Sequence, residues 1–212
     1  MTTSALAVVA DGVSLGVGSV VEEFCVVGRH GSGPTVIGPG ATLRTHTVVY
    51  AGNTIGARFS TGHHALVRES NTIGDDVSVG SLSTVEHHVT IGDGVRIHSQ
   101  CFIPEYSVLE AGCWIGPRVT LTNAPFPRCQ HMPNCLLGVT VGRDAKLGAN
   151  VTVLPGVRIG ERALVGAGAV VTRDVPAGAV VVGNPGRAVR TVDDLLCPVG
   201  EPHSPYPDPD RK

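Results

Sequence analysis

The sequence predicts an all-β fold, a parallel β-helix of hexapeptide repeats with a protruding loop and a short C-terminal helix. The main observation is a period of six residues in the aliphatic side chains. Fourteen of the fifteen positions in the longest run are aliphatic, and glycine often follows them: Ile37, Leu43, Val49, Ile55, Thr61, Val67, Ile73, Val79, Val85, Ile91, Ile97, Ile103, Leu109, Ile115 and Leu121. The same step appears before and after this run: Val9, Leu15, Val21, Val27, Val141, Leu147, Val153, Ile159, Val165 and Val171.

A period of six fits neither the 3.6-residue period of a helix nor the two-residue period of a strand. It is typical of a triangular coil in which each hexad forms one short strand and one corner. The aliphatic residue points inward, and a glycine or a small polar residue turns the corner. Three hexads complete a coil of eighteen residues, and coils stack at the spacing of paired strands, about 4.8 Å. Several coils must stack before a core exists.

Two breaks in the period define the domain organisation. Val27 and Ile37 are ten residues apart, which indicates an insertion of four. Leu121 and Val141 are twenty apart, so residues 122–140 must leave the coil as a loop of a length that is usually functional. We therefore expect a β-helix domain over residues 1–183. Residues 184–212 are expected to form a short helix, within "NPGRAVRTVDDLL", and a disordered proline-rich tail.

Composition excludes several classes of function. A net charge of -2 with 16% charged residues provides no basic surface for nucleic acid or for an anionic membrane. No apolar run approaches the roughly 20 residues that span a bilayer. The N-terminal "MTTSALAVVADG" lacks a basic leader, so a cytoplasmic enzyme is expected.

The six cysteines lack the paired C-x-x-C spacing of zinc or redox sites. Cys101 and Cys113 occur where small apolar side chains recur, so both are expected to be reduced core residues. The segment "CQHMPNC" places His131 between Cys129 and Cys135. Three soft ligands at this spacing favour a plain loop over a zinc or redox site, and the role of the segment stays open.

The eighteen-residue coil also predicts which side chains stack outside the core. Steps of eighteen from His87 reach Glu69, Glu105 and, one coil further, Asn123. A histidine between carboxylates is suited to general-base catalysis, because a carboxylate can hold one ring N–H while the other nitrogen takes a proton. We expect one glutamate to orient His87 and the other to face substrate or pair with an arginine. The alternative is a solvated polar ladder at a corner.

The other histidines have weaker settings. His88 shares its column with Ser70 and Tyr106, so it is expected to be a surface or substrate-contact residue. His46 and His64 are also eighteen apart and form the most metal-like pair in the sequence.

A third metal ligand would have to come from His63, from His98 or from another subunit. No metal is therefore expected.

As a whole, the hexad pattern resembles the left-handed parallel β-helix of the hexapeptide-repeat acyltransferase superfamily, and this resemblance implies the left-handed sense. The segment "STVEHHVTIG" resembles the "VEH" segment of sugar acetyltransferases of the sialic-acid and bacillosamine pathways. The resemblance implies that His87 is the catalytic base. The sequence differs in having His88 where those enzymes carry an acidic residue.

A second resemblance involves "TGHHALVRESNTIG" and "IGPRVTLTNAPFPR", which are similar to segments of nucleotide-linked 3-amino-sugar N-acetyltransferases. In some of these enzymes the substrate amine is bound neutral and no protein base is needed. Ala124 replaces the aspartate that usually follows the asparagine of this motif. The expected substrate-binding residues are His63, Arg68, His88 and Tyr106.

The stretch Ile159–Arg190 resembles the terminal coils that bind acetyl-CoA in the superfamily. Small residues stacked at a corner are expected to leave a groove for the pantetheine arm, and arginines near the end suit the nucleotide phosphates. The alternative is that the small residues only permit tight turns. The expected cofactor-binding residues are Gly148, Ala149, Gly166, Ala167, Arg173, Arg187 and Arg190.

Together these features predict an acetyl-CoA-dependent N-acetyltransferase acting on the amine of a dTDP- or UDP-linked amino sugar. Backbone N–H groups or Asn123 are expected to stabilise the oxyanion. A homotrimer with active sites between subunits is expected, since one coil offers only a flat face. The alternatives are an O-acetyltransferase of a sugar or antibiotic, a γ-carbonic-anhydrase-like zinc enzyme and a non-catalytic scaffold. The zinc enzymes carry a pair of histidines five residues apart, and this sequence has none.

Overall fold

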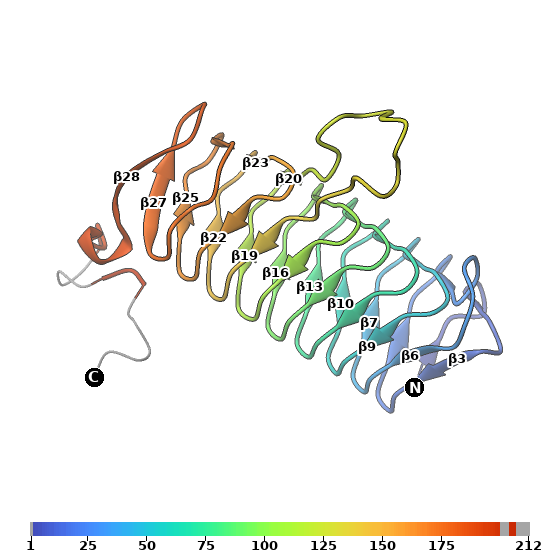
Figure 1. The fold of residues 1–212 in the computed structure, drawn as a ribbon. Helices are drawn as coiled ribbons and strands as arrows, with labels where there is room; N and C mark the ends of the chain where they lie inside the picture. The colour runs from blue at the N-terminus through green and yellow to red at the C-terminus, as the bar shows by residue number, and fades with distance from the viewer. Residues whose placement is uncertain (1, 200–203, 207–212) are drawn as a thin grey trace.

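The structure is a computed structural model that describes residues 2–199 and 204–206, and these form one stack of coils (Figure 1). Neighbouring coils pair through parallel strands whose partners are eighteen residues apart along the regular run, such as Ile73 and Ile91. The fold class predicted from the sequence, a left-handed parallel β-helix of hexapeptide repeats, is confirmed.

Each complete coil contributes one strand to each of three sheets, which we call A, B and C. Sheet A contains β1 (Thr2–Thr3), β4 (Val20–Val21), β7 (Thr42–Leu43), β10 (Ser60–Thr61), β13 (Ser78–Val79), β16 (Arg96–Ile97), β19 (Trp114–Ile115), β22 (Lys146–Leu147), β25 (Leu164–Val165), β27 (Ala179–Val182) and β28 (Arg187–Thr191). Sheet B contains β2 (Val8–Val9), β5 (Val26–Val27), β8 (Val48–Val49), β11 (Leu66–Val67), β14 (Thr84–Val85), β17 (Phe102–Ile103), β20 (Thr120–Leu121), β23 (Thr152–Val153) and β26 (Val170–Val171). Sheet C contains β3 (Val13–Leu15), β6 (Thr35–Ile37), β9 (Thr54–Ile55), β12 (Thr72–Ile73), β15 (Thr90–Ile91), β18 (Val108–Leu109), β21 (Thr140–Val141) and β24 (Arg158–Ile159).

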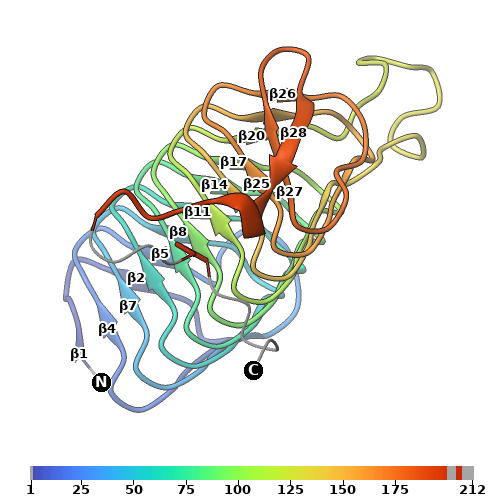
Figure 2. The same cartoon turned by 90° about the vertical axis from the view of Figure 1, so that its left-hand side faces the viewer.

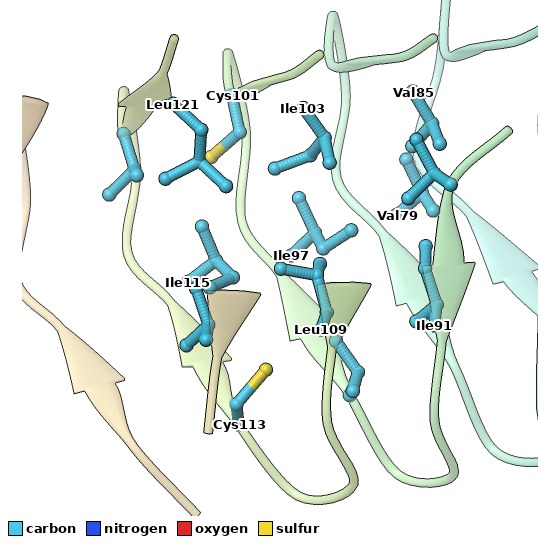
Figure 3. Close-up of a cluster of buried hydrophobic side chains, with 14 of the residues drawn as sticks. Val79, Val85, Ile91, Ile97, Cys101, Ile103, Leu109, Cys113, Ile115 and Leu121 are labelled. Carbon is cyan, nitrogen blue, oxygen red and sulfur yellow. The ribbon is translucent and has the colours of Figure 1, made fainter. Parts of the chain in front are cut away.

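The core is a continuous column of inward side chains, to which most strands contribute one residue. Buried residues from the segments between strands, such as Val89 and Val95, fill the space between these layers. Ile91, Ile103 and Leu109 are at most 2% exposed and point into the interior of the coil (Figure 3). Full burial of such a side chain contributes about 1.5–3 kcal/mol relative to exposure. Cys101 and Cys113 are buried free thiols between these layers, as the sequence predicts, and burial raises the pKa of Cys113 to about 12.

Two positions at each corner have different structural roles, which the period alone does not predict. The residue three places after the inward aliphatic turns the corner in the left-handed region, as at His64 (φ 56°) and His88 (φ 57°). The glycine directly after the aliphatic is needed for another reason. At Gly92 a Cβ would lie only 2.7 Å from the backbone nitrogen of Ala111 in the next coil. Those glycines permit stacking, and the residue three places after the aliphatic makes the turn, whether it is polar, apolar as at Leu82, or a second glycine as at Gly94.

The two breaks in the hexad period are accommodated without disturbing the stack. After the four-residue insertion, Leu15 pairs with Ile37, and after the long loop, Leu109 pairs with Val141. The loop, residues 122–140, leaves the coil between β20 and β21, as predicted, and projects beside β20 (Figure 1). Figure 2 shows the same loop standing away from the stacked coils.

The prediction of a C-terminal helix is wrong for residues 187–191. Residues Arg187–Thr191 form strand β28, which pairs antiparallel with β27, and the only helical turn in the described chain is the 3-10 segment η1 (Val192–Asp194). The physical reason is that β27 would otherwise leave an open sheet edge at the end of the stack. The chain reverses after Gly183 and covers that edge. The predicted disordered tail falls largely on residues 200–203 and 207–212, which lie outside the described residues.

Across the described residues, no helix has the length and apolarity needed to cross a membrane.

Candidate active site

The predicted histidine lies at the corner between sheets B and C, where β14 ends and β15 begins. His87 precedes the left-handed corner residue His88, and its side chain is 22% exposed. The backbone N–H of Val89, just after the corner, donates to Asn71 Oδ1 of the preceding coil at 2.7 Å. The corner that carries the two histidines is therefore hydrogen-bonded to the preceding coil.

Both ring nitrogens of His87 face groups of this chain. Nδ1 lies 2.7 Å from Nδ1 of His88, so one of these nitrogens carries the hydrogen and the other accepts it. Nε2 lies 3.7 Å from Glu105 Oε1, close enough for an ion pair when His87 is charged but too far for a hydrogen bond. The ring of Tyr106 lies beside both histidines, with its centroid 5.7 Å from that of His88.

Glu105 is itself held by the asparagine of the column. Asn123 is buried, and its Nδ2 donates to Glu105 Oε2 at 2.8 Å and to the Glu105 carbonyl oxygen at 3.3 Å. Both amide hydrogens of Asn123 are thus directed to Glu105. This geometry positions the Glu105 carboxylate against His87, and it leaves the expected oxyanion role of Asn123 without a free donor.

Glu69 is hydrogen-bonded to Arg68 rather than to His87, which follows it in the column. Arg68 Nη2 and Nε donate to its two oxygens at 2.9 and 3.1 Å, and Arg68 Nη1 donates to Glu86 Oε2 at 2.7 Å. Partial burial acts to raise the pKa of Glu69, but a backbone N–H bond, Arg68 and nearby His87 outweigh it and lower the pKa. Glu86 is therefore a further residue of this site that was not predicted, although the step of eighteen from Arg68 reaches it.

The structure separates another expected substrate residue from this group. His63 lies at the corner between sheets A and B, where its Nδ1 is 2.8 Å from Thr45 Oγ1. Arg68, His88 and Tyr106 lie at the corner of His87, so within one chain these three come together and His63 does not.

The expected histidine stack is present, without a metal site around it. The rings of His46 and His64 are parallel within 15°, with centroids 4.5 Å apart. Across residues 2–199 and 204–206, no three His, Cys, Asp or Glu side chains gather in a way that could hold a metal ion. Cys129 and Cys135 are free thiols in the loop. Desolvation, and to a smaller extent the neighbouring Cys129, raises the pKa of Cys135.

The expected acyl-donor residues lie at the last coils. A Cβ on Gly148 would lie 2.6 Å from the backbone nitrogen of Ala167, so this glycine is required for coil stacking. A Cβ on Gly166 would meet Val182 at 2.9 Å, and Val182 pairs with Arg187 of β28. The structure thus brings Gly166 and Arg187 to the same end of the stack.

Gly148 and Gly166 stack at one corner with Ala149 and Ala167, since β22 and β25 pair in register. Arg173, Arg187 and Arg190 are exposed.

Two stretches of the chain match the model of a known protein family. Residues 72–105 and 138–173 match the family model described as bacterial transferase hexapeptide (six repeats). The match includes the corner of His87 and the coils of Gly148 and Gly166. With the fold, it supports the expected superfamily of hexapeptide-repeat acyltransferases.

Particular relatives match over more limited ranges. A stretch of 57 residues is 47% identical to the 2,3,4,5-tetrahydropyridine-2,6-dicarboxylate N-acetyltransferase of Staphylococcus aureus. It covers 27% of this chain and 24% of that protein, so the chain matches about a quarter of the length of this curated relative.

Solved structures are similar over more of the chain. A UDP-N-acetylglucosamine acyltransferase from Bacteroides fragilis has a TM-score of 0.68 at 15% identity, over 89% of this chain and 74% of that one. A protein from Bacillus cereus that is assigned as an acetyltransferase has a TM-score of 0.55 at 21% identity, over 66% of this chain and 77% of that one. At these identities the likeness shows the fold.

Proposed function

We propose that this protein is an acetyl-CoA-dependent N-acetyltransferase that acts on the amine of a nucleotide-linked amino sugar, with His87 as the general base. The observation that supports this best is the geometry around His87 Nε2. This nitrogen faces Glu105 across 3.7 Å, with no hydrogen bond between them. A substrate N–H can therefore reach the ring nitrogen with a carboxylate beside it.

The proton transfer follows from these positions. As the amine nitrogen attacks the thioester carbonyl carbon, the N–C bond forms and His87 Nε2 accepts the amine proton. The resulting imidazolium carries its new N–H towards the Glu105 carboxylate, which stabilises the positive charge. The C–S bond then breaks, and the CoA thiolate takes the proton from His87. A positioned base of this kind contributes about 10²–10⁴-fold to the rate.

The charged groups around the histidines support a polar substrate. Arg68 is bound to Glu69 and Glu86, which keeps a fixed cation at the corner. The aromatic face of exposed Tyr106 lies beside His88 and suits a sugar ring or the nucleobase of the carrier. The dTDP or UDP carrier is part of the proposal.

The acyl donor is proposed to bind towards the C-terminal coils. Exposed Arg187 and Arg190 on β28 are suited to the phosphates of CoA, because a guanidinium pairs with phosphate through two hydrogen bonds. Since Gly148 is explained by stacking, the arginines carry more of this argument than the glycines do.

His88 and Tyr106 are exposed at the corner of His87 on one chain, which supports a homotrimer with active sites between subunits. Apolar side chains are exposed in the loop, with Phe126 at 75% and Leu137 at 51%. Exposed apolar surface beside an open polar site is typical of a face that another subunit covers.

Thiol release from acetyl-CoA against a panel of dTDP- and UDP-amino sugars tests the proposal. Release that depends on one amino sugar supports it, and a matched hydroxy sugar identifies O-acetyl transfer instead. If none of the amino sugars in the panel causes thiol release, the proposed substrate class is wrong. His87→Ala is expected to lower kcat about 10³-fold while acetyl-CoA binding is kept. Near-normal turnover in this variant would show that the substrate amine needs no protein base.

A further inference from the structure

The contact between the two histidines restricts how His87 can act. A neutral imidazole carries one N–H and one lone pair. The Nδ1 atoms of His87 and His88 are 2.7 Å apart, so one ring donates and the other accepts. If His88 donates, the hydrogen of His87 lies on Nε2; if His87 donates, its Nε2 has a free lone pair.

The proposed base requires the second arrangement, because only a lone pair on Nε2 can accept the amine proton. The 2.7 Å contact can form in either direction, and this requirement selects His87 as its donor. The Glu105 carboxylate, 3.7 Å from Nε2, then stabilises the imidazolium once Nε2 has taken the proton. We propose that His88 is a positioning residue whose Nδ1 accepts the N–H of His87 Nδ1, which directs the basic lone pair of His87 to Nε2. This inference rests on the proposed function.

The two carboxylates of the column are both engaged away from Nδ1. Glu69 is bound by Arg68 through both of its oxygens, and Glu105 faces Nε2, on the other side of the ring. In this proposal a second imidazole has the orienting role at Nδ1 that a glutamate of the column is predicted to have. The His88 side chain is exposed, so its Nε2 can exchange hydrogen with solvent.

The position of His88 is itself well defined. Its backbone is in the left-handed conformation, and its N–H donates to the Glu69 carbonyl oxygen at 3.4 Å. The next residue, Val89, is tied to Asn71, and Tyr106 packs beside the ring from the following coil. Three successive coils therefore hold this imidazole in place.

The test compares two substitutions of His88 with a matched control. His88→Asn keeps an acceptor, because Asn Oδ1 is the same number of bonds from the backbone as His Nδ1. His88→Leu removes the acceptor, and Leu82 shows that leucine is tolerated in this left-handed corner conformation (φ 59°). The control is His64→Leu, which removes a corner histidine of the same conformation that lies against His46.

We expect His88→Leu to lower kcat about 10²-fold, with KM within about twofold, while His88→Asn restores at least a tenth of the activity. His64→Leu should leave kcat unchanged. Nitrogen NMR of histidine-labelled protein should place the hydrogen of His87 on Nδ1 in the wild type and in His88→Asn. In His88→Leu it should shift towards Nε2.

Two results would overturn the inference: a wild-type His87 that carries its hydrogen on Nε2, or a His88→Leu variant as active as His64→Leu. The NMR measurement needs no substrate, so it tests the contact even if no amino sugar is accepted. His87→Ala separates the remaining cases. If that variant is inactive while His88→Leu is active, the base stands and the positioning role fails; if both are active, the proposed base fails as well.

Discussion

Replacing Asn71 with valine removes a buried side-chain amide that links two neighbouring coils beneath the candidate site. Asn71 is 2% exposed; its Oδ1 accepts the Val89 N–H at 2.7 Å, and its Nδ2 donates to the Arg68 carbonyl oxygen at 2.8 Å. Valine fits this column sterically, because Val89 occupies the equivalent place one coil later. The substitution thus leaves the buried N–H of Val89 without an acceptor.

The magnitude follows from that orphaned donor. An unsatisfied buried donor costs about 1–3 kcal/mol, and the lost bond to Arg68 adds about 0.5–1.5 kcal/mol. The carbonyl oxygen of Arg68 keeps the 2.7 Å bond from Asn53 Nδ2, and the buried valine methyls offset part of the loss. We expect the free energy of unfolding to fall by about 2–3 kcal/mol.

Urea unfolding at fixed protein concentration measures this loss, and the same column supplies a control. Ser107 lies one coil beyond Val89, and its buried Oγ has no hydrogen-bond partner within the described chain. Ser107→Val should therefore be neutral or stabilising. An Asn71→Val variant as stable as Ser107→Val would refute the argument that the amide satisfies Val89. A large loss in both would show that valine does not fit the column.

Three further predictions concern the site and its surroundings. Gly148→Ala should cost about 1–3 kcal/mol, because its Cβ would overlap Ala167, whereas Gly12→Ala, with open space around it, should not; equal stabilities would contradict this. The lowered pKa of Glu69 contributes stability above its unfolded value near 4.5, which is lost as pH falls through the folded value; the unfolding free energies of Glu69→Gln and wild type should therefore converge below pH 4.5 rather than diverge. Arg187→Gln should raise the KM for acetyl-CoA about tenfold, or about 1.4 kcal/mol, with kcat unchanged, and an unchanged KM would place the phosphates elsewhere.

The period of six residues determines most of the fold, because each inward aliphatic is both a spacing signal and a core residue. Ile91 and Leu121 are buried where the period places them, and the loop leaves the coil where the period breaks. The C-terminal segment was predicted wrongly for a reason of context. Its residues form β28 because the open edge of β27 lies beside them, and an edge created by the end of a stack has no local sequence signal.

For the candidate site, the sequence by itself determined which residues share a corner. Steps of eighteen place His87 near Glu105 and Asn123, since stacked coils repeat at that interval. Only the tertiary structure decided which atoms are in contact. Asn123 donates a hydrogen bond to Glu105, and Arg68 donates to Glu69. The Nδ1 atoms of His87 and His88 are in hydrogen-bond contact. Side-chain rotation about a corner is not encoded in a period. It is set by which neighbour offers the better hydrogen bond in three dimensions.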